Sequence, residues 1–239
     1  RVFDRIRDAI RILPVGDLRL GYRTSIIKRS LHDEQAGGGR IWANTGRYVV
    51  LSADFQLAHA SLSAPIEYQQ LADKLGVKLG ERVDMRQVRE AVLELRRSKG
   101  MVLDPTDPDT CSCGSFFTNP IISNEDALKL PAAAPRFPVY DLQLRNSVTG
   151  VAPKLQGLVK TSAAWLISHA GFSKGFTLDA TDGSGQPVRA SLSNKHVLAL
   201  TNRGPASSAD IAQLAATIKR GVWEKFGVEL VEEPVQVGF

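Results

Sequence analysis

Cysteine is scarce in this sequence, with two residues, Cys111 and Cys113, in 239. A pair separated by one residue lacks the second pair, or the histidines, that a zinc site needs. Its close spacing also disfavours a structural disulfide. We therefore expect two free thiols in a cytoplasmic protein, and we assign no metal ligand.

Long hydrophobic runs are absent as well. No apolar stretch approaches the roughly 20 residues that a membrane-spanning helix needs. Residues 1–8 are rich in charge, unlike a secretory signal. We therefore expect neither membrane association nor secretion. The first residue is not Met, and residues 2–4 resemble the inside of a strand, so we expect a fragment or a trimmed sequence.

Charge of one sign does not dominate, because the net charge is +5 and the isoelectric point is about 9.3. A nucleic-acid-binding protein would gather its basic residues on one face with aromatic residues between them. Here they are scattered, and the densest cluster is Arg96, Arg97 and Lys99 at the end of a predicted helix. Such a cluster is typical of a solvated helix end. We expect no nucleic-acid partner, although an anionic small molecule remains an alternative.

The composition is that of an ordinary soluble protein of one or two domains, with 43% hydrophobic and 23% charged residues. Residues 1–62 have the pattern of strand and turn, with predicted strands over 9–13 and 48–57. A polar loop containing three glycines, residues 37–39, lies between them. From residue 63 helical and strand patterns alternate, which indicates an α+β domain with a mixed sheet.

Three helices are predicted from their caps and apolar spacing. The first begins at Asp84, forms a capping-box pattern with Gln87 and ends at Gly100. The second covers 162–170 and stops at Gly171, and the third covers 207–226 and stops at Gly227. The apolar face of the third comprises Ile211, Leu214, Ile218, Val222 and Phe226. Strands are predicted over 197–200 and 228–239, and a long loop over 131–153, where prolines interrupt the chain.

The segment 114–120, GSFFTNP, is the first candidate for chemistry. Gly114 permits a sharp turn before Ser115, and two aromatic residues can keep water away from the hydroxyl. A serine placed so can donate or relay a proton, whereas a plain junction between loop and strand is the alternative. A serine hydrolase is disfavoured, because the G-x-S-x-G pattern is absent and nothing in the sequence pairs a histidine with Ser115.

Two further segments carry charged candidates. Arg23, within residues 21–25 (GYRTS), can hold a carboxylate or phosphate with two parallel hydrogen bonds, or can be a surface residue in a turn. Glu232 and Glu233 precede Pro234, and in an extended strand only one of them can face a site. The glycine run 37–39 lacks both common phosphate-loop spacings, so no nucleotide-binding motif is recognisable.

Several segments in this order resemble the UDP-N-acetylenolpyruvoylglucosamine reductases. They are residues 21–25 (GYRTS), 103–105 (LDP), 114–120 (GSFFTNP), 160–167 (KTSAAWLI), 170–175 (AGFSKG), 196–202 (HVLALTN) and 233–235 (EPV). The resemblance implies an enzyme in which NADPH reduces FAD. The flavin then reduces the enolpyruvyl ether of UDP-N-acetylglucosamine to UDP-N-acetylmuramate, a precursor of peptidoglycan. It also implies a cytoplasmic, monomeric protein.

The resemblance assigns a role to each candidate residue. Ser115 matches the family's proton donor to C2, while Arg23 and Glu233 match residues that grip and polarise the substrate carboxylate. Tyr68 and Asn119 match substrate-contacting positions, the tyrosine lying on a loop that closes over the nucleotide sugar in the family. Lys99 matches a position that meets the pyrophosphate.

The resemblance further implies a division of the chain. Residues 1–62 match the end of a flavin-binding domain of the vanillyl-alcohol-oxidase type, and residues 63–239 match a mixed α/β substrate-binding domain. The family's flavin-binding stretches, Gly-Gly-Gly-Ser-Asn and Gly-Ala-Tyr-Gly, do not occur here. We therefore name no FAD-binding residue and expect the chain alone to bind FAD poorly and to be inactive.

Two departures from the family pattern concern other positions. Cys111 replaces a bulky residue, often tryptophan, and residues 136–157 lack the family's usual Pro-Asp-Gly turn. The catalytic set is intact, which favours a reductase. The alternative is a UDP-sugar-binding module that has lost the flavin and the catalytic activity.

Overall fold

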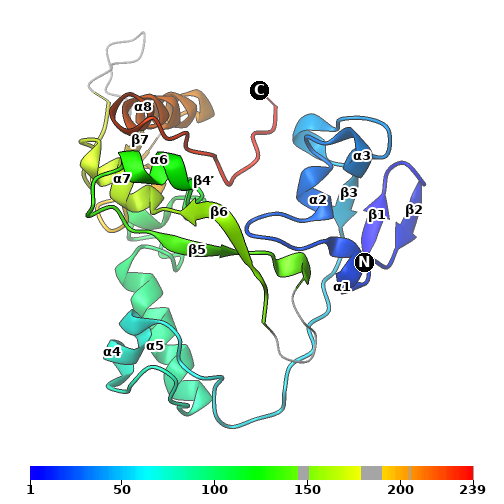
Figure 1. The fold of residues 1–239 in the computed structure, drawn as a ribbon, viewed down its shortest axis with the longest axis horizontal. Coiled ribbons are helices and arrows are strands. Elements are labelled where there is room, and N and C mark those ends of the chain that lie inside the picture. Colours follow the sequence, from blue (N-terminus) through cyan, green and yellow to red (C-terminus); the bar gives the residue numbers. More distant parts are fainter. Residues whose placement is uncertain (145–150, 179–189, 205, 239) are drawn as a thin grey trace. The chain divides into compact units, whose positions relative to one another are not determined.

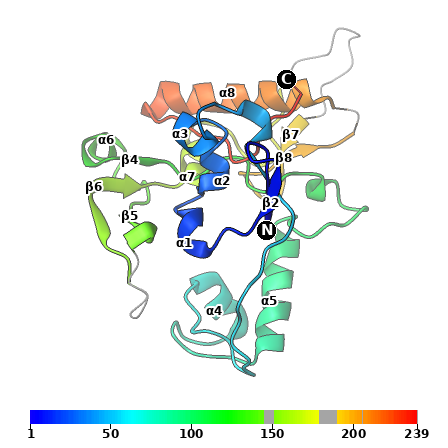
Figure 2. The same cartoon turned by 90° about the vertical axis from the view of Figure 1, so that its right-hand side faces the viewer.

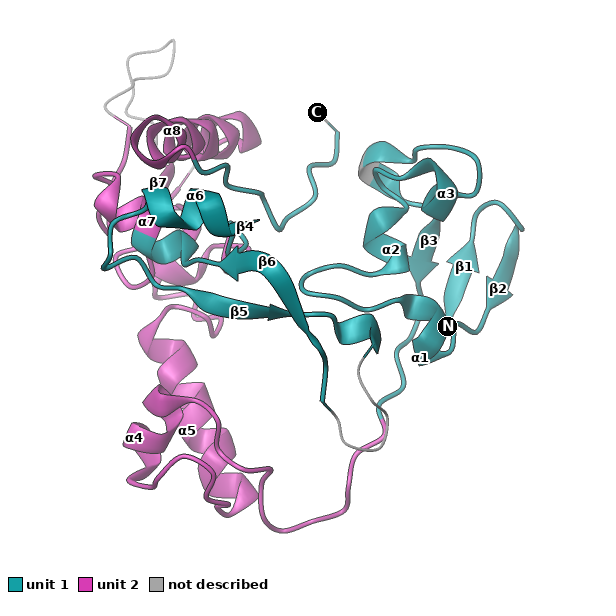
Figure 3. Cartoon of the chain, in the orientation of Figure 1, with its two compact units in different colours: residues 1–55, 117–165, 228–239 teal, residues 56–116, 166–227 magenta. Residues whose placement is uncertain are grey.

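The computed structural model describes residues 1–144, 151–178, 190–204 and 206–238 (Figure 1). The chain divides into two compact units, each assembled from segments far apart in the sequence (Figure 3). Unit 1 comprises residues 1–55, 117–165 and 228–239, and unit 2 comprises residues 56–116 and 166–227. The family-domain boundary expected near residue 62 is a different division from this spatial grouping and stays a prediction.

A three-stranded antiparallel sheet lies at the start of unit 1, in the order β2-β1-β3. Its strands are β1 (Val2–Asp4), β2 (Ala9–Arg11) and β3 (Tyr48–Val50). In its register Val2 is opposite Arg11 on one side and Val50 on the other. The strands predicted over 9–13 and 48–57 are therefore present but shorter than expected.

Short helices also occur in residues 1–62, so the expectation of strand and turn alone was wrong. They are α1 (Val15–Leu18), α2 (Ile26–Arg29), α3 (Glu34–Gly37) and the 3₁₀ turn η1 (Ala43–Thr45). Ser25 caps α2 by accepting a hydrogen bond from the N–H of Lys28, and Asp33 caps α3 in the same way. A helix of one turn is too short to display a repeating apolar face, which is why periodicity missed them.

The second sheet of unit 1 has the order β4-β6-β5, with strands β4 (Ile121–Ser123), β5 (Phe137–Tyr140) and β6 (Lys154–Lys160). The helix α6 (Asn124–Lys129) follows β4, and the 3₁₀ turn η3 (Leu142–Leu144) follows β5. The loop predicted over 131–153 was therefore wrong at β5, and its residues 145–150 lie outside the described residues. Pro138 is tolerated because β5 is an edge strand and pairs only with β6.

The expected mixed sheet is not found, because every strand ladder in the described ranges is antiparallel. Parallel neighbours require a crossover connection of a dozen or more residues, usually a helix. Here the strands form antiparallel pairs whatever the length of chain between them. The combination of helices and sheets expected from the sequence is confirmed.

Unit 2 is mainly helical. Its elements include α4 (Gln69–Leu75), α5 (Met85–Ser98), the 3₁₀ turn η2 (Pro108–Thr110), strands β7 (Ala190–Leu192) and β8 (Leu200–Asn202), and α8 (Ser208–Phe226). The helix α7 (Ala163–His169) begins in unit 1 and ends in unit 2. All three predicted helices are confirmed as α5, α7 and α8.

The caps and faces of these helices follow the sequence signals. Asp84 accepts hydrogen bonds from the N–H groups of Arg86 and Gln87, and Ser207 forms a capping box with Asp210. The long helix α8 (Figure 2) packs against β7 and β8. It buries Leu214, Ile218 and Val222 completely, as its spacing predicted.

Two predicted strands were misplaced. In place of a strand over 197–200, β8 begins at Leu200 and pairs with β7. Within the described part of 228–239 there is no strand ladder, and a single bridge joins Phe117 to Glu232. A run of β-branched residues indicates that the segment is buried. Whether the segment pairs as a strand depends on a neighbouring strand that the local sequence does not contain.

Two further findings concern the cysteines and the possibility of a membrane-spanning helix. Cys111 and Cys113 are both free and exposed. None of the helices in the described ranges has the length and apolar character needed to span a lipid bilayer.

Gly221 in α8 offers a test of packing against helix propensity. A methyl group at this position would lie 2.6 Å from the tip of the Phe172 ring, which is itself buried. Alanine should favour the helix by about 1 kcal/mol, but overpacking costs about 1–3 kcal/mol. We expect Gly221→Ala to lower the free energy of unfolding, measured by urea denaturation. Gly16→Ala is the control, since beyond its chain neighbours and the backbone of its own helix no atom lies within 4 Å of the added methyl group. An equal effect of both changes would contradict the packing argument.

Candidate functional site

Arg23 is presented by a tight turn in unit 1. The backbone groups of Gly21 and Thr24 bond each other, with N–H···O distances of 3.0 and 3.4 Å. Arg23 occupies the left-handed region of the backbone at φ 53°, which is unfavourable for a residue other than glycine. Strain of this kind is concentrated at functional sites, where surrounding contacts hold it. The turn therefore places the Arg23 side chain in a defined position just before α2.

The structure brings Arg23 and Glu233 together from opposite ends of the chain. The guanidinium Nη1 lies 3.4 Å from Oε1 of Glu233, and the Lys28 ammonium donates to the Glu233 carbonyl oxygen at 3.1 Å. The side chains of Arg23 and Glu233 are 54% and 32% exposed, so the pair itself contributes little to stability. Both groups are instead accessible to a ligand.

Asn119 lies beside the same turn. Its backbone N–H donates to the hydroxyl of Tyr22 at 3.2 Å, and its Oδ1 accepts from the N–H of Ala163, the first residue of α7, at 3.0 Å. The hydrogen bonds described for Asn119 thus use its backbone and Oδ1. Its Nδ2 group is the donor that remains for a ligand.

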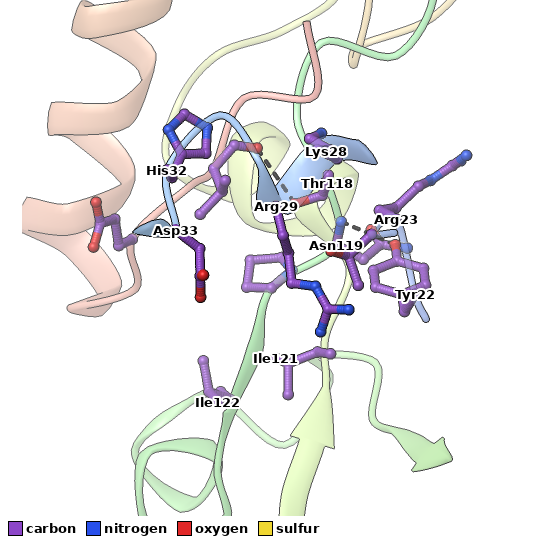
Figure 4. A pocket seen from close by; sticks show the side chains of 14 residues that line it. Tyr22, Arg23, Lys28, Arg29, His32, Asp33, Thr118, Asn119, Ile121 and Ile122 are labelled. Carbon is purple, nitrogen blue, oxygen red and sulfur yellow. Dashed lines mark hydrogen bonds between the residues drawn. The ribbon is translucent and has the colours of Figure 1, made fainter. Parts of the chain in front are cut away.

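A pocket of about 560 Å³ in unit 1 is lined by Arg23 and Asn119 (Figure 4), and Glu233 lies beside it through its contact with Arg23. Its lining residues are Tyr22, Arg23, Thr24, Lys28, Arg29, His32, Asp33, Thr118, Asn119, Pro120, Ile121, Ile122, Glu229 and Val231. Two nitrogen atoms of Arg29, Nε and Nη2, are buried with no acceptor in the described part of the chain. Because this positive charge has no hydrogen-bonded counterpart, the pocket favours an anionic ligand.

Ser115 belongs to unit 2, where its hydroxyl lies 3.3 Å from Nε2 of His196. Gly114 precedes it in the left-handed region at φ 79°, and the N–H of Phe116 donates to the carbonyl oxygen of Leu198 at 2.7 Å. These backbone contacts hold Ser115 against the segment that carries His196. The sequence singled out Ser115 but not its partner, because 80 residues separate the two and no local signal links His196 to the serine.

The position of His196 is fixed by polar contacts of the loop that carries it. The buried hydroxyl of Ser193 accepts hydrogen bonds from the N–H groups of Lys195 and His196, at 3.0 and 3.2 Å. The Lys195 ammonium pairs with Asp107 at 2.5 Å. The loop that carries His196 is therefore anchored at several points, which limits the movement of the ring relative to Ser115.

Asp109 is a buried carboxylate that supports the same loop. It accepts from the N–H of Asn194 at 2.9 Å and forms an ion pair with Arg203. Sequence reasoning did not single out Asp109 or His196. His196 lies within a segment of the family pattern, but that segment gave no partner for it.

A serine beside a histidine raises the question of hydrolysis. In a hydrolytic triad a third group, usually a carboxylate, orients the histidine ring. Within the described residues no carboxylate forms a hydrogen bond or ion pair with the ring of His196. The arrangement therefore supports proton donation by Ser115 better than nucleophilic attack.

Burial lowers the pKa of His196, and the positive charges of Lys99 and Lys174 lower it further. The ring is consequently neutral at neutral pH. We expect this pKa to lie below the usual 6.5 in an NMR titration of the ring protons. Lys99→Met should raise it without restoring the usual value, since burial is the larger cause. An unchanged pKa in the variant would show that Lys99 does not act on His196.

Lys99 and Tyr68 lie in unit 2 near the helix pair α4 and α5, which pack together and are joined by an ion pair between Lys74 and Glu94. Lys99 caps the end of α5 and donates to Oε1 of Gln70 at 2.8 Å. Tyr68 immediately precedes α4 and is 75% exposed. The six predicted site residues are therefore divided, with Arg23, Asn119 and Glu233 in unit 1 and Tyr68, Lys99 and Ser115 in unit 2.

Comparison with known proteins identifies related sequences. Residues 105–237 match the family described as the C-terminal domain of UDP-N-acetylenolpyruvoylglucosamine reductase. Proteins with that name are 47% identical over 238 residues in Thermobifida fusca, 44% over 238 residues in Cutibacterium acnes and 45% over 240 residues in Mycobacterium avium. These alignments cover 99–100% of this chain and 53–58% of each relative, so the chain spans little more than half the length of these relatives.

Proposed function

This chain belongs to the family of the UDP-N-acetylenolpyruvoylglucosamine reductase C-terminal domain, and from this we propose that it provides the substrate-binding domain and proton donor of such a reductase. The overall reaction is the NADPH-dependent, FAD-mediated reduction of the enolpyruvyl ether of UDP-N-acetylglucosamine to UDP-N-acetylmuramate. It belongs to the synthesis of peptidoglycan precursors in the cytoplasm. Residues 1–62 then correspond to part of a flavin-binding domain and residues 63–239 to the substrate domain.

The contact between Arg23 and Glu233 carries this proposal. Arg23 and Glu233, which the resemblance assigns to the substrate carboxylate, come from opposite ends of the chain and lie 3.4 Å apart, beside a pocket with excess positive charge. Arg23 can hold a carboxylate with two parallel hydrogen bonds. As the resemblance implies, Glu233 polarises the same carboxylate, and in its protonated form it donates a hydrogen bond to the enolate-like intermediate.

Ser115 supplies the proton in this proposal. Reduction of the double bond adds a hydride at C3 and a proton at C2, and the proton comes from the Ser115 hydroxyl. Water finally restores the proton to Ser115. Asn119 contacts the substrate through Nδ2, Lys99 meets the pyrophosphate, and Tyr68 covers the nucleotide sugar.

The glycine run 37–39 does not fit the phosphate of a flavin. The N–H groups of Gly37, Gly38 and Gly39 donate to the carbonyl oxygens of Asp33, Gln35 and Glu34 at the end of α3. Amide groups that close a helix in this way are not available to cradle a phosphate. We therefore assign none of these residues to FAD.

Calorimetry with the enolpyruvyl ether tests the role of Arg23. We expect Arg23→Ala to weaken binding by about 1.5–3 kcal/mol, the contribution of a hydrogen bond to a charged group. Arg7→Ala is the matched control, because Arg7 is exposed in the same unit and does not line the pocket. Equal affinities of the two variants would remove Arg23 from the site. If the unaltered chain fails to bind, either the chain alone does not form the site or the proposed substrate is wrong.

A further inference from the structure

The hydroxyl of Ser115 has a single hydrogen, and its direction decides whether it can reach a substrate. The neighbouring Nε2 of His196, at 3.3 Å, can either donate a hydrogen bond to the hydroxyl or accept one from it. If Nε2 accepts, the Ser115 hydrogen points at the imidazole ring. If Nε2 carries a hydrogen and donates, the hydrogen of Ser115 is left to point elsewhere.

We propose that His196 is a positioning residue whose Nε2–H donates to Ser115, directs the serine hydrogen toward the substrate and stabilises the alkoxide that proton transfer leaves. This inference rests on the proposed role of Ser115 as proton donor. The bond that breaks is the O–H bond of Ser115, and the bond that forms joins that hydrogen to C2. His196 keeps its proton throughout, and water returns a proton to Ser115.

The surroundings of the ring favour this arrangement. A neutral ring has one N–H group, so placing it on Nε2 leaves the deprotonated nitrogen, Nδ1, on the far side from Ser115. Among the described residues no carboxylate forms a hydrogen bond or ion pair with the ring to hold a hydrogen on Nδ1. Burial of the ring, and then the charges of Lys99 and Lys174, oppose a second proton on it. The loop contacts of Ser193 keep the ring in place, so the donor does not have to be ordered during the reaction.

The tautomer can be measured directly on this chain. Long-range ¹H–¹⁵N correlation spectra at neutral pH should show the hydrogen of His196 on Nε2, and Ser115→Ala should shift that Nε2 signal. A spectrum with the hydrogen on Nδ1 would overturn the proposal, whatever the chain's activity. This result depends only on the pair itself, so it separates failure of this inference from failure of the proposed reaction.

Activity provides the second measurement, in a reductase that contains this chain. His196→Phe removes the donor while keeping a ring, and we expect kcat to fall by about 10- to 100-fold with little change in KM, as for the loss of one hydrogen bond to a charged group. His196→Gln keeps an N–H donor and should stay within a few-fold of the unaltered protein. The control is His59→Phe at an exposed position of the same unit. Equal losses in the Gln and Phe variants, with both folded by circular dichroism, would show a structural role and overturn the proposal.

Discussion

The substitution Ser115→Ala should lower kcat for reduction of the enolpyruvyl ether by about 10²- to 10⁴-fold, the usual contribution of a positioned general acid. Binding of the ether should be almost unaffected, because the hydroxyl acts on developing charge at C2 rather than on the bound ground state. The measurement is steady-state kinetics of an active reductase containing this chain, combined with calorimetry on the same variant.

Ser98→Ala is a suitable control for this result. Ser98 is an exposed residue of unit 2 whose hydroxyl bonds only within its own helix, to the carbonyl oxygen of Leu95. A loss of less than about threefold in the Ser115 variant would contradict the role of general acid, since another group or water would then supply the proton. The alternative of a UDP-sugar-binding module without catalytic activity predicts ether binding with no turnover even in the unaltered protein.

The substitution Asp4→Asn should lower the free energy of unfolding by about 3–5 kcal/mol, the typical result of removing one partner of a buried ion pair. Asp4 is completely buried in β1. Arg47 grips it with two hydrogen bonds of 2.9 and 2.8 Å, and Arg11 adds one of 2.9 Å. The side chain of Arg47 is itself only 13% exposed, so the change leaves a nearly buried guanidinium without its counter-charge.

The same site predicts a pH dependence. Hydrogen bonds from Arg47 hold the pKa of Asp4 far below its usual value. Burial opposes this shift, and hydrogen bonds from Arg11 and from the N–H of Ile6 add to it. In the unfolded chain Asp4 becomes protonated at about pH 3.9, whereas in the folded chain it becomes protonated only in much stronger acid. The contribution is therefore complete above the unfolded pKa and is lost as the pH falls toward the folded pKa.

Urea unfolding at pH 7 and at pH 3 measures both effects. We expect the difference between the unaltered protein and Asp4→Asn to be large at pH 7 and smaller at pH 3. Asp54→Asn makes the same chemical change at an exposed site of unit 1 and should have little effect at either pH. A loss in Asp4→Asn that is independent of pH would show that shape rather than charge stabilises this site.

Local signals in the sequence determined the long helices. Asp84 and Ser207 supply caps, and the apolar residues of α8 recur at the spacing of one helical face, so α5 and α8 could be placed without any tertiary information. The motif order likewise indicated the family. These signals work because a cap or a helical face is formed by residues within a few positions of one another.

Tertiary structure alone decided the length and pairing of the strands and the residue pairs at the site. The sequence indicated strands near β1, β2 and β3 but not their bounds or partners, and β5 forms despite Pro138 because it lies at an edge. The contacts of Arg23 with Glu233 and of Ser115 with His196 join residues distant in the chain. The residue types at those positions indicate which chemistry is available, but hydrogen bonding and ion pairing require distances of about 3–4 Å. Only the folded chain fixes such distances between positions so far apart in sequence.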